Sequence, residues 1–247
     1  ESAVSRRHAL WNSDPWSPHA STGRSSRRLS TEPAERTLRS RDTRDHRGMQ
    51  TVFPTASSWV RSCPIELHLS RGGTPVARAH RPDSRYLRIR PGAYAVADDW
   101  QRLKPWERYL ARVHAAALCL GDVVFSHESA AALLGLPVFG EPRVVHVMDD
   151  SAHSRRYAGV LVHASDAPRS IVRVDGFVMT DLPDIAIDLG RALPPAFAVA
   201  LVDAILRRLQ TDDAVRQLRR HSARSPHRRG TRQLSWLWNR VDARSES

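Results

Sequence analysis

The clearest hydrophobic pattern in the chain lies between Pro105 and Gly121. Five apolar residues recur there at intervals of three and four, which places them on one face of a helix. Proline in the first turn and glycine after the last turn stand where helices favour them. The pattern therefore predicts an amphipathic helix whose buried face is formed by Trp106, Leu110, Val113, Ala117 and Leu120.

Shorter patterns predict strands on both sides of this helix. Tyr86–Arg90 alternates apolar and basic residues, and Pro91-Gly92 then predicts the turn of a β-hairpin with arginines on one face. Further strands are expected at Val123–Phe125, Arg143–Met148, Gly159–His163 and Ile171–Met179, the last broken by a turn at Asp175-Gly176.

The rest of the chain reads mainly as helices. Serine and threonine are common N-caps, so Ser126 predicts the start of a helix over Glu128–Leu134 that Gly135 ends, and Thr180 predicts one that reaches about Arg191. Other helices are expected at Thr74–Ala79, at Pro194–Leu209, after Thr211-Asp212-Asp213, and at Leu234–Val241. The predicted class is α+β: a small winged-helix-like unit, then a mixed domain of sheet and helices.

The pattern also predicts a division of the chain. Residues 1–50 are rich in Ser, Arg and Pro, and we expect a disordered or non-native extension whose natural start is near Met49. Residues 51–100 are expected to form the small basic unit, 101–221 the mixed domain, and 222–247 a basic tail with a short helix.

The net charge and its distribution along the chain suggest a polyanionic partner. The net charge is +12, carried by 37 arginines and Lys104. Residues 61–120 hold 11 basic and 5 acidic side chains, 121–190 hold 5 and 10, and 206–247 hold 11 and 4. A nucleic acid is expected to contact the two basic blocks and avoid the acidic middle.

Two cysteines, Cys63 and Cys119, form neither a redox pair nor a zinc set, which fits a reducing cytoplasm. No stretch has the roughly 18 apolar residues of a membrane span, so no membrane association is expected.

The search for catalytic chemistry is mostly negative. His127-Glu128 lacks the second histidine of a zinc protease motif, because Ala131 stands at that position. Lys104 has no acidic strand beside it, so the core of a restriction-type nuclease is missing. Asp149-Asp150 fits a solvated turn better than a cation site. We therefore expect no enzyme, no cofactor and no metal.

One alternative stays open. His146 and His163 lie in neighbouring predicted strands and can share a face, but two histidines without a third ligand are weak evidence for a metal. An enzyme whose residues converge only in the fold would gather His127, His146 or His163 with acids in one place.

Three stretches together resemble the AbiEi family of type IV antitoxins and related actinobacterial proteins. They are Arg90–Tyr94, Ser126–Pro137 (SHESAAALLGLP), and Val174–Thr180 followed by Ile187-Asp188-Leu189. The resemblance covers about residues 60–210. It implies a winged-helix DNA-binding domain, an antitoxin domain, binding at the chain's own promoter, and a nucleotidyltransferase-like toxin as genetic partner.

The chain departs from that family in three places. The segment before the wing is short and interrupted by Gly72-Gly73, and Asp184-Ile185 replaces the family's Arg-Thr. Many relatives continue into a nuclease domain where this chain ends. The leading hypothesis is a cytoplasmic DNA-binding regulator; the alternatives are a non-enzymatic protein-interaction module or a truncated remnant of a nuclease-containing relative. The expected DNA contacts are to phosphates, from Arg78, Arg81, Arg85, Arg88, Arg90, Arg216, Arg219, Arg220, Arg228 and Arg229.

Overall fold

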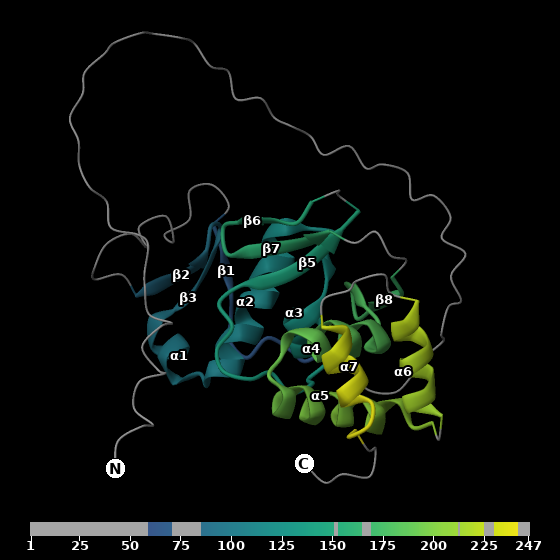
Figure 1. The fold of residues 1–247 in the computed structure, drawn as a ribbon. Helices are drawn as coiled ribbons and strands as arrows, with labels where there is room; N and C mark the ends of the chain where they lie inside the picture. Colours follow the sequence, from purple (N-terminus) through teal and green to yellow (C-terminus); the bar gives the residue numbers. More distant parts are fainter. Residues whose placement is uncertain are drawn as a thin grey trace, which may run out of the picture. The chain divides into compact units, whose positions relative to one another are not determined.

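A computed structural model describes residues 59–70, 85–150, 153–164, 169–211, 213–224 and 230–241. The chain separates by its internal contacts into residues 1–47 and 48–247, and everything described belongs to the second unit. The expected extension over 1–50 and the expected helix at Thr74–Ala79 lie outside the described residues. Over the described residues the fold mixes helices with two sheets, as the α+β prediction required (Figure 1).

A small three-stranded antiparallel sheet precedes the first long helix. Its strands are β1 (His68–Leu69), β2 (Tyr86–Arg90) and β3 (Ala93–Val96), in the order β1-β3-β2. The predicted hairpin is confirmed, with Gly92 in its turn at a φ of +88°. The pairing register shifts between Arg88 and Arg90, so strict alternation is lost there. The expectation of equivalent arginines on one face is therefore wrong: Arg88 is exposed, whereas Arg90 is half-buried.

Two helices follow the small sheet. The first, α1 (Ala97–Arg102), has no buried residue and was not predicted. The second, α2 (Pro105–Leu120), has the predicted bounds, and Gly121 follows it. The predicted buried face is confirmed in part, because Val113 is buried and Leu110, Ala117 and Leu120 pack against the core, but Trp106 is 51% exposed and the fully buried Tyr109 was not predicted. Small alanines beside Tyr109 let this face approach its neighbours closely, and hydropathy spacing does not detect that.

The main sheet has six strands in the order β6-β7-β5-β4-β9-β8. Neighbouring pairs are antiparallel except β5 with β7 and β4 with β9, which are parallel. β6 was not predicted, because its short polar sequence shows no alternation. The strands are β4 (Val124–Phe125), β5 (Val145–Asp149), β6 (Arg155–Tyr157), β7 (Val160–Ala164), β8 (Ile171–Val174) and β9 (Phe177–Thr180).

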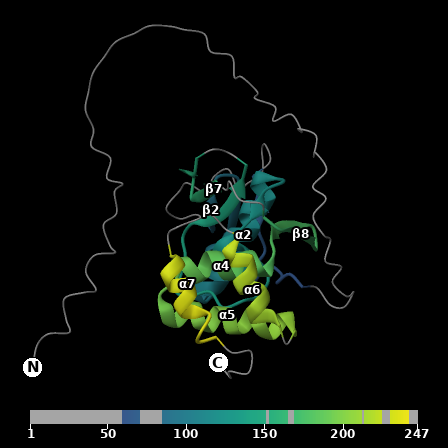
Figure 2. The same cartoon turned by 45° about the vertical axis from the view of Figure 1, so that its right-hand side comes forward.

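The helices from α2 to α7 pack with this sheet to form the hydrophobic core. α3 contacts α2, β5 and α4, and the last three helices, α5, α6 and α7, all contact α4 (Figures 1 and 2). Buried Val145, Val147, Val160 and Val162 line one face of β5 and β7. These helices are α3 (His127–Leu133), α4 (Leu182–Ala192), α5 (Pro195–Leu209), α6 (Ala214–Ala223) and α7 (Thr231–Leu237).

The ends of α3 and α4 lie within about one residue of the predicted positions, but the capping groups are partly different. Gly135 has a φ of +65° and ends α3, with Leu136 N–H donating to Ala131 C=O as in a Schellman motif. Ser126 is the N-cap of α3, but its hydroxyl makes no capping bond. Thr180 does not cap α4, because it is still paired in β9 with Ile171; Asp181 is the cap.

The C-terminal helix α7 is part of the core. Leu234, Leu237 and Trp238 are buried, and Gly190 of α4 lies so close that an added Cβ would stand 2.9 Å from a Leu234 methyl group. In the described part of the chain, no helix has both the length and the hydrophobicity to cross a membrane.

Leu237→Ala tests this packing. Leu237 is fully buried, so we expect its truncation to lower the free energy of unfolding by about 2–5 kcal/mol. Urea unfolding followed by tryptophan fluorescence measures the change. Leu118→Ala is the matched control, because Leu118 is 52% exposed and its loss should cost less than about 0.5 kcal/mol. Equal losses in the two variants would contradict the core position of α7.

Candidate functional site

Three histidines from three different elements meet in one place. His127 is the first residue of α3, His146 lies on β5 and His163 on β7. Nδ1 of His146 lies 2.9 Å from Nε2 of His163, and the His127 ring stacks on His163 with ring centres 3.9 Å apart. One ring nitrogen from each lies within 4.8 Å of the others. We call these three residues the histidine cluster.

The strand register accounts for two members of the cluster. In the parallel pair β5–β7, His146 stands opposite Leu161, and His163 stands opposite Met148. Successive side chains of a strand point to opposite faces, so both imidazoles project from the face opposite the buried valines. The prediction that His146 and His163 share a face is confirmed.

His127 joins them through an uncommon backbone conformation. Its φ is +49°, in the left-handed region that side chains other than glycine seldom adopt. Such conformations persist where the surrounding structure enforces them and often mark functional sites. The Ser126 hydroxyl, which does not cap α3, lies 3.2 Å from Nδ1 of His127.

A buried chain of hydrogen bonds holds α3 against β5. The Tyr109 hydroxyl lies 2.8 Å from the Ser129 hydroxyl and donates to the Val144 carbonyl. Tyr109 has one proton to give, so Ser129 donates to Tyr109. Ser129 in turn accepts from the His146 backbone N–H at 2.8 Å. The SHES segment therefore contributes both a cluster imidazole and the hydroxyl that positions the strand carrying another.

Two carboxylates lie beside the cluster. Glu128 Oε2 is 3.5 Å from Nε2 of His146, and Asp188 Oδ2 is 3.9 Å from Nδ1 of His127. Asp188 also forms a two-pronged ion pair with Arg169, whose Nη2 lies 2.9 Å from Asp188 Oδ1. The cluster is thus connected through Asp188 to a second group of charges.

That second group is an ion-pair network on α4. Asp184 and Asp188 are one turn apart and only 2% and 7% exposed, and the Arg169 guanidinium contacts both. Asp184 also accepts from the Ser170 N–H and lies 2.9 Å from Nε2 of His221. Burial alone would raise the pKa of Asp184, but the bond from His221 and the charge of Arg169 outweigh it and lower that pKa. Asp184 is therefore ionised.

Burial keeps the histidine cluster neutral. It lowers the pKa of His146 to about 4, helped by the charge of Arg156. Burial, with His146 and Arg169 adding to it, lowers the pKa of His163 to about 4. Burial and the two neighbouring imidazoles hold the pKa of His127 well below its ordinary value. Three neutral imidazoles with converging nitrogens are donors that a transition metal can use.

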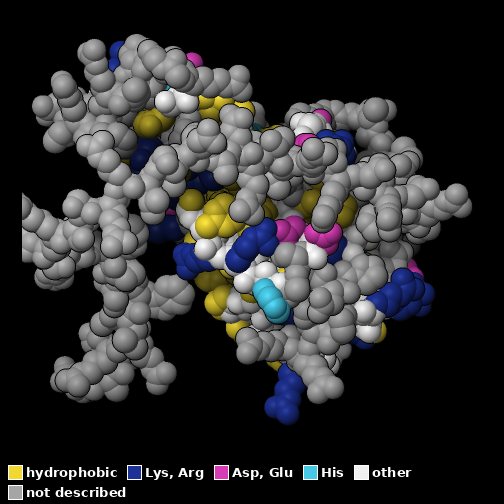
Figure 3. Space-filling view, turned by 90° about the horizontal axis from the view of Figure 1, so that it is seen from above, with side chains coloured by type: hydrophobic (Ala, Val, Ile, Leu, Met, Phe, Trp, Pro, Cys, Tyr) yellow, Lys and Arg dark blue, Asp and Glu magenta, His cyan; other side chains and the backbone are white. Residues whose placement is uncertain are grey.

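The arginines predicted to bind DNA are dispersed. Arg85, just before β2, and Arg88, in the middle of β2, are exposed, and among the described strands β2 lies at the edge of its sheet. Nε of Arg90 is buried and forms no hydrogen bond among the described residues. On the face seen in Figure 3, described Lys and Arg side chains form separate groups with acidic side chains among them. Arg78, Arg81, Arg228 and Arg229 lie outside the described residues.

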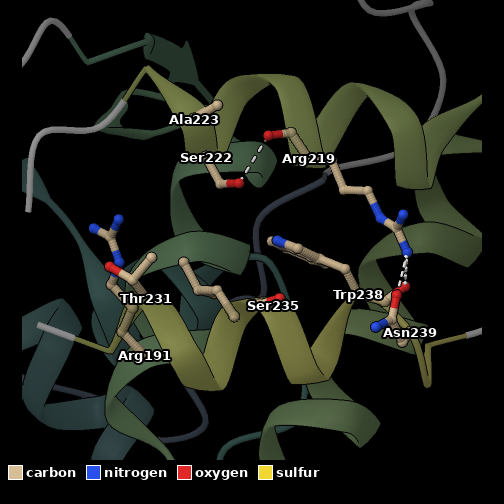
Figure 4. Close-up of a pocket in the computed structure, with 9 residues that line it drawn as sticks. Arg191, Arg219, Ser222, Ala223, Thr231, Ser235, Trp238 and Asn239 are labelled. Carbon is tan, nitrogen blue, oxygen red and sulfur yellow. Dashed lines mark hydrogen bonds between the residues drawn. The ribbon is translucent and has the colours of Figure 1, made fainter. Parts of the chain in front are cut away.

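The predicted arginines of α6 are largely engaged within the protein. Arg216 and Arg220 both form ion pairs with Asp213. Arg219 donates to the Trp238 carbonyl and to the Asn239 side chain (Figure 4). These bonds stand at the rim of a hollow of about 360 Å³ between α6 and α7, whose described lining contains arginines, serines and apolar groups but no carboxylate or histidine.

Sequence reasoning missed Arg169, Asp184, Asp188 and His221 as a connected group. The signal available was the four-residue spacing of Asp184 and Asp188, which places them on one helix face. Their cationic partner comes from a different segment, so no local pattern pointed to it. The alternative that His127, His146 and His163 converge in the fold agrees with the geometry, because β4 pairs with β5 and α3 begins just after β4.

Arg169→Met tests the buried network. It leaves Asp184 and Asp188 buried beside each other without their shared cation, so we expect a loss of roughly 3–5 kcal/mol in the free energy of unfolding. Urea unfolding at neutral pH measures it. Arg173→Met removes the same charge from an exposed position on β8 and should change stability by less than about 0.5 kcal/mol. Similar stabilities for the two variants would contradict the network.

The depressed histidine pKa values predict sensitivity to acid. In the unfolded chain an imidazole titrates near 6.5, whereas His146 and His163 in the fold titrate near 4. Between these values the unfolded chain binds protons that the folded chain does not, so stability is complete above about pH 6.5 and falls toward pH 4. For His146 alone the loss can reach about 3 kcal/mol, at about 1.4 kcal/mol per unit of pKa difference.

Urea unfolding with a chelator present, between pH 7 and pH 5, measures this dependence. His163→Gln removes one titrating group and should give a flatter profile than the natural chain. Burial raises the pKa of Glu128 above its ordinary value of 4.5, so this carboxyl contributes the opposite slope over the pH range just above that value. Stability that rises on acidification from pH 7 would show that the imidazoles are not buried as neutral groups.

A scan against protein-family models and a search of curated proteins found no match to this chain. Its function is therefore inferred from its own residues.

Proposed function

We propose that this chain is a DNA-binding regulatory protein that contacts phosphates through the basic edge of its small sheet. The observation that carries the proposal is the exposure of Arg88 on β2 and of Arg85 just before it, on a strand that lies at the edge of the sheet among the described strands. Guanidinium groups held on a hairpin reach a phosphate backbone without distorting the fold. The net charge of +12 favours the encounter.

The arrangement of the small sheet supports a wing. In the order β1-β3-β2, β3 is the central strand and pairs with both β1 and β2, so β2 is the strand of the hairpin that lies at an edge among the described strands. The resemblance of Arg90–Tyr94 and Ser126–Pro137 to type IV antitoxins agrees with this role. In this proposal the chain acts by binding, its target is DNA of its own promoter, and a nucleotidyltransferase-like toxin is its genetic partner.

The basic C-terminal helices contribute less in this proposal than counting charges suggests. Arg216 and Arg220 share Asp213, so a phosphate would have to compete with a carboxylate already in contact. Arg85 and Arg88 are therefore the main contacts within the described residues, and the α6 arginines add long-range attraction.

The test is a salt titration of DNA binding with matched double variants. Fluorescence anisotropy with a labelled duplex compares the natural chain, Arg85→Ala/Arg88→Ala, and Arg216→Ala/Arg220→Ala. Each double variant loses two charges. Two lost phosphate contacts should reduce the slope of log K against log salt by about 2, and we expect this for the β2 variant only.

Other outcomes separate the alternatives. Equal losses in both variants would mean that net charge, not the β2 edge, governs binding. An affinity unchanged between low and physiological salt, or no binding of duplex DNA at all, would refute the proposal. The chain's own upstream DNA against a scrambled duplex shows whether binding is specific.

A further inference from the structure

We propose that His127, His146 and His163 form a binding site for one divalent transition-metal ion of the zinc class. The site is separate from the basic edge of the small sheet, and it does not depend on DNA binding. Its three histidines come from α3, β5 and β7 and are brought together by the fold.

The nitrogen positions come close to those of a metal site. Zn–N bonds are about 2.0–2.1 Å, so two nitrogens on one tetrahedral zinc lie roughly 3.4 Å apart. Nδ1 of His146 and Nε2 of His163 are 2.9 Å apart, so the pair needs to open by only about half an ångström. These two nitrogens face each other and define where the ion sits.

His127 supplies the third nitrogen after a rotation of its ring. Its plane is 13° from that of His163 in a stack, and a metal lies in the plane of each imidazole that binds it. Binding therefore tilts the His127 ring out of the stack. Nδ1 of His127 lies near Ser126 and Asp188, which leaves Nε2 for the ion.

Two carboxylates lie at positions that are typical of the outer coordination shell of a metal site. Glu128 Oε2 lies 3.5 Å from Nε2 of His146, the nitrogen turned away from His163, and Asp188 Oδ2 lies 3.9 Å from Nδ1 of His127; both are near these nitrogens without hydrogen-bonding to them. Carboxylates on the remote nitrogen orient metal-bound histidines and increase their basicity. Oε2 of Glu128 is buried and makes no hydrogen bond within the described structure, so a nearby cation would offset the cost of its burial.

Three protein ligands leave one coordination position for water or another ligand. Imidazole donors without a bound carboxylate or thiolate favour Zn²⁺ and neighbouring transition metals over Mg²⁺ or Ca²⁺, which prefer oxygen. The site is thus predicted to select by donor type, and Mg²⁺ should not compete at equal concentration.

The first test is a Zn²⁺ titration of the full, untagged chain after chelator treatment, in competition with a chromophoric chelator. We expect one Zn²⁺ per chain from this site, bound more than about 100-fold more weakly after His127→Gln or His163→Gln, and about 10–100-fold more weakly after Glu128→Gln. His153→Gln is the matched control, because His153 is exposed and outside the cluster. Its affinity should equal that of the natural chain.

The second test uses only the natural chain, so it does not depend on the folding of variants. X-ray absorption of the zinc-loaded protein counts imidazole ligands, and three of them are expected. Stoichiometric binding that survives both cluster substitutions would place the ion elsewhere and overturn the proposal. Absence of binding at micromolar Zn²⁺, or a spectrum with oxygen ligands alone, would overturn it as well.

Discussion

The packing of α3 against β5 is the contact on which the rest of the described architecture depends. α3 begins immediately after β4, and it must turn sharply to lie beside the strand that β4 pairs with. The left-handed His127 makes that turn, and the Ser129 hydroxyl satisfies the His146 N–H that β4 is too short to reach. An unsatisfied backbone N–H at this depth would cost about 1–3 kcal/mol. The same contact that completes the sheet therefore also assembles the histidine cluster.

Buried charge sets a second constraint. Asp184 and Asp188 face the protein interior from α4, which also packs against α5 and α7. Isolated carboxylates are not tolerated there, so Arg169 and His221 are drawn in from segments before α4 and at the end of α6.

Local pattern predicted the elements well where one face is apolar and the ends carry turn residues. The hairpin at Pro91-Gly92, the helix from Pro105, and the Asp175-Gly176 turn are examples. The local pattern failed where strand pairing overrides the capping preference of a residue type. Thr180 is a good N-cap by type, but its partnership with Ile171 extends the strand by one residue and moves the cap to Asp181.

The candidate site was only partly predictable for a related reason. His146 and His163 share a face because side chains alternate along each strand and because β5 and β7 are neighbours in the sheet. The arrival of His127 follows from the strand order, in which β4 lies between β5 and β9. No local spacing encodes that order. A motif search rejected His127-Glu128 for want of a histidine four residues on, yet the fold supplies two histidines from strands 19 and 36 residues further along.

The number of charged residues in a segment also fails to locate a binding surface, because it does not show which of those charges already have partners in the fold. The C-terminal block holds 11 basic residues against 4 acidic ones, yet Asp213 alone contacts two of its arginines and Arg219 is bonded to the end of α7. An exposed ion pair is worth little in energy, but it still orients the guanidinium away from a second anion. The shorter hairpin presents fewer arginines, but Arg88 on β2 and Arg85 just before it are exposed, whereas Arg90 is half-buried. The free orientation of a charge, more than the number of charges in a segment, decides where a phosphate backbone can bind.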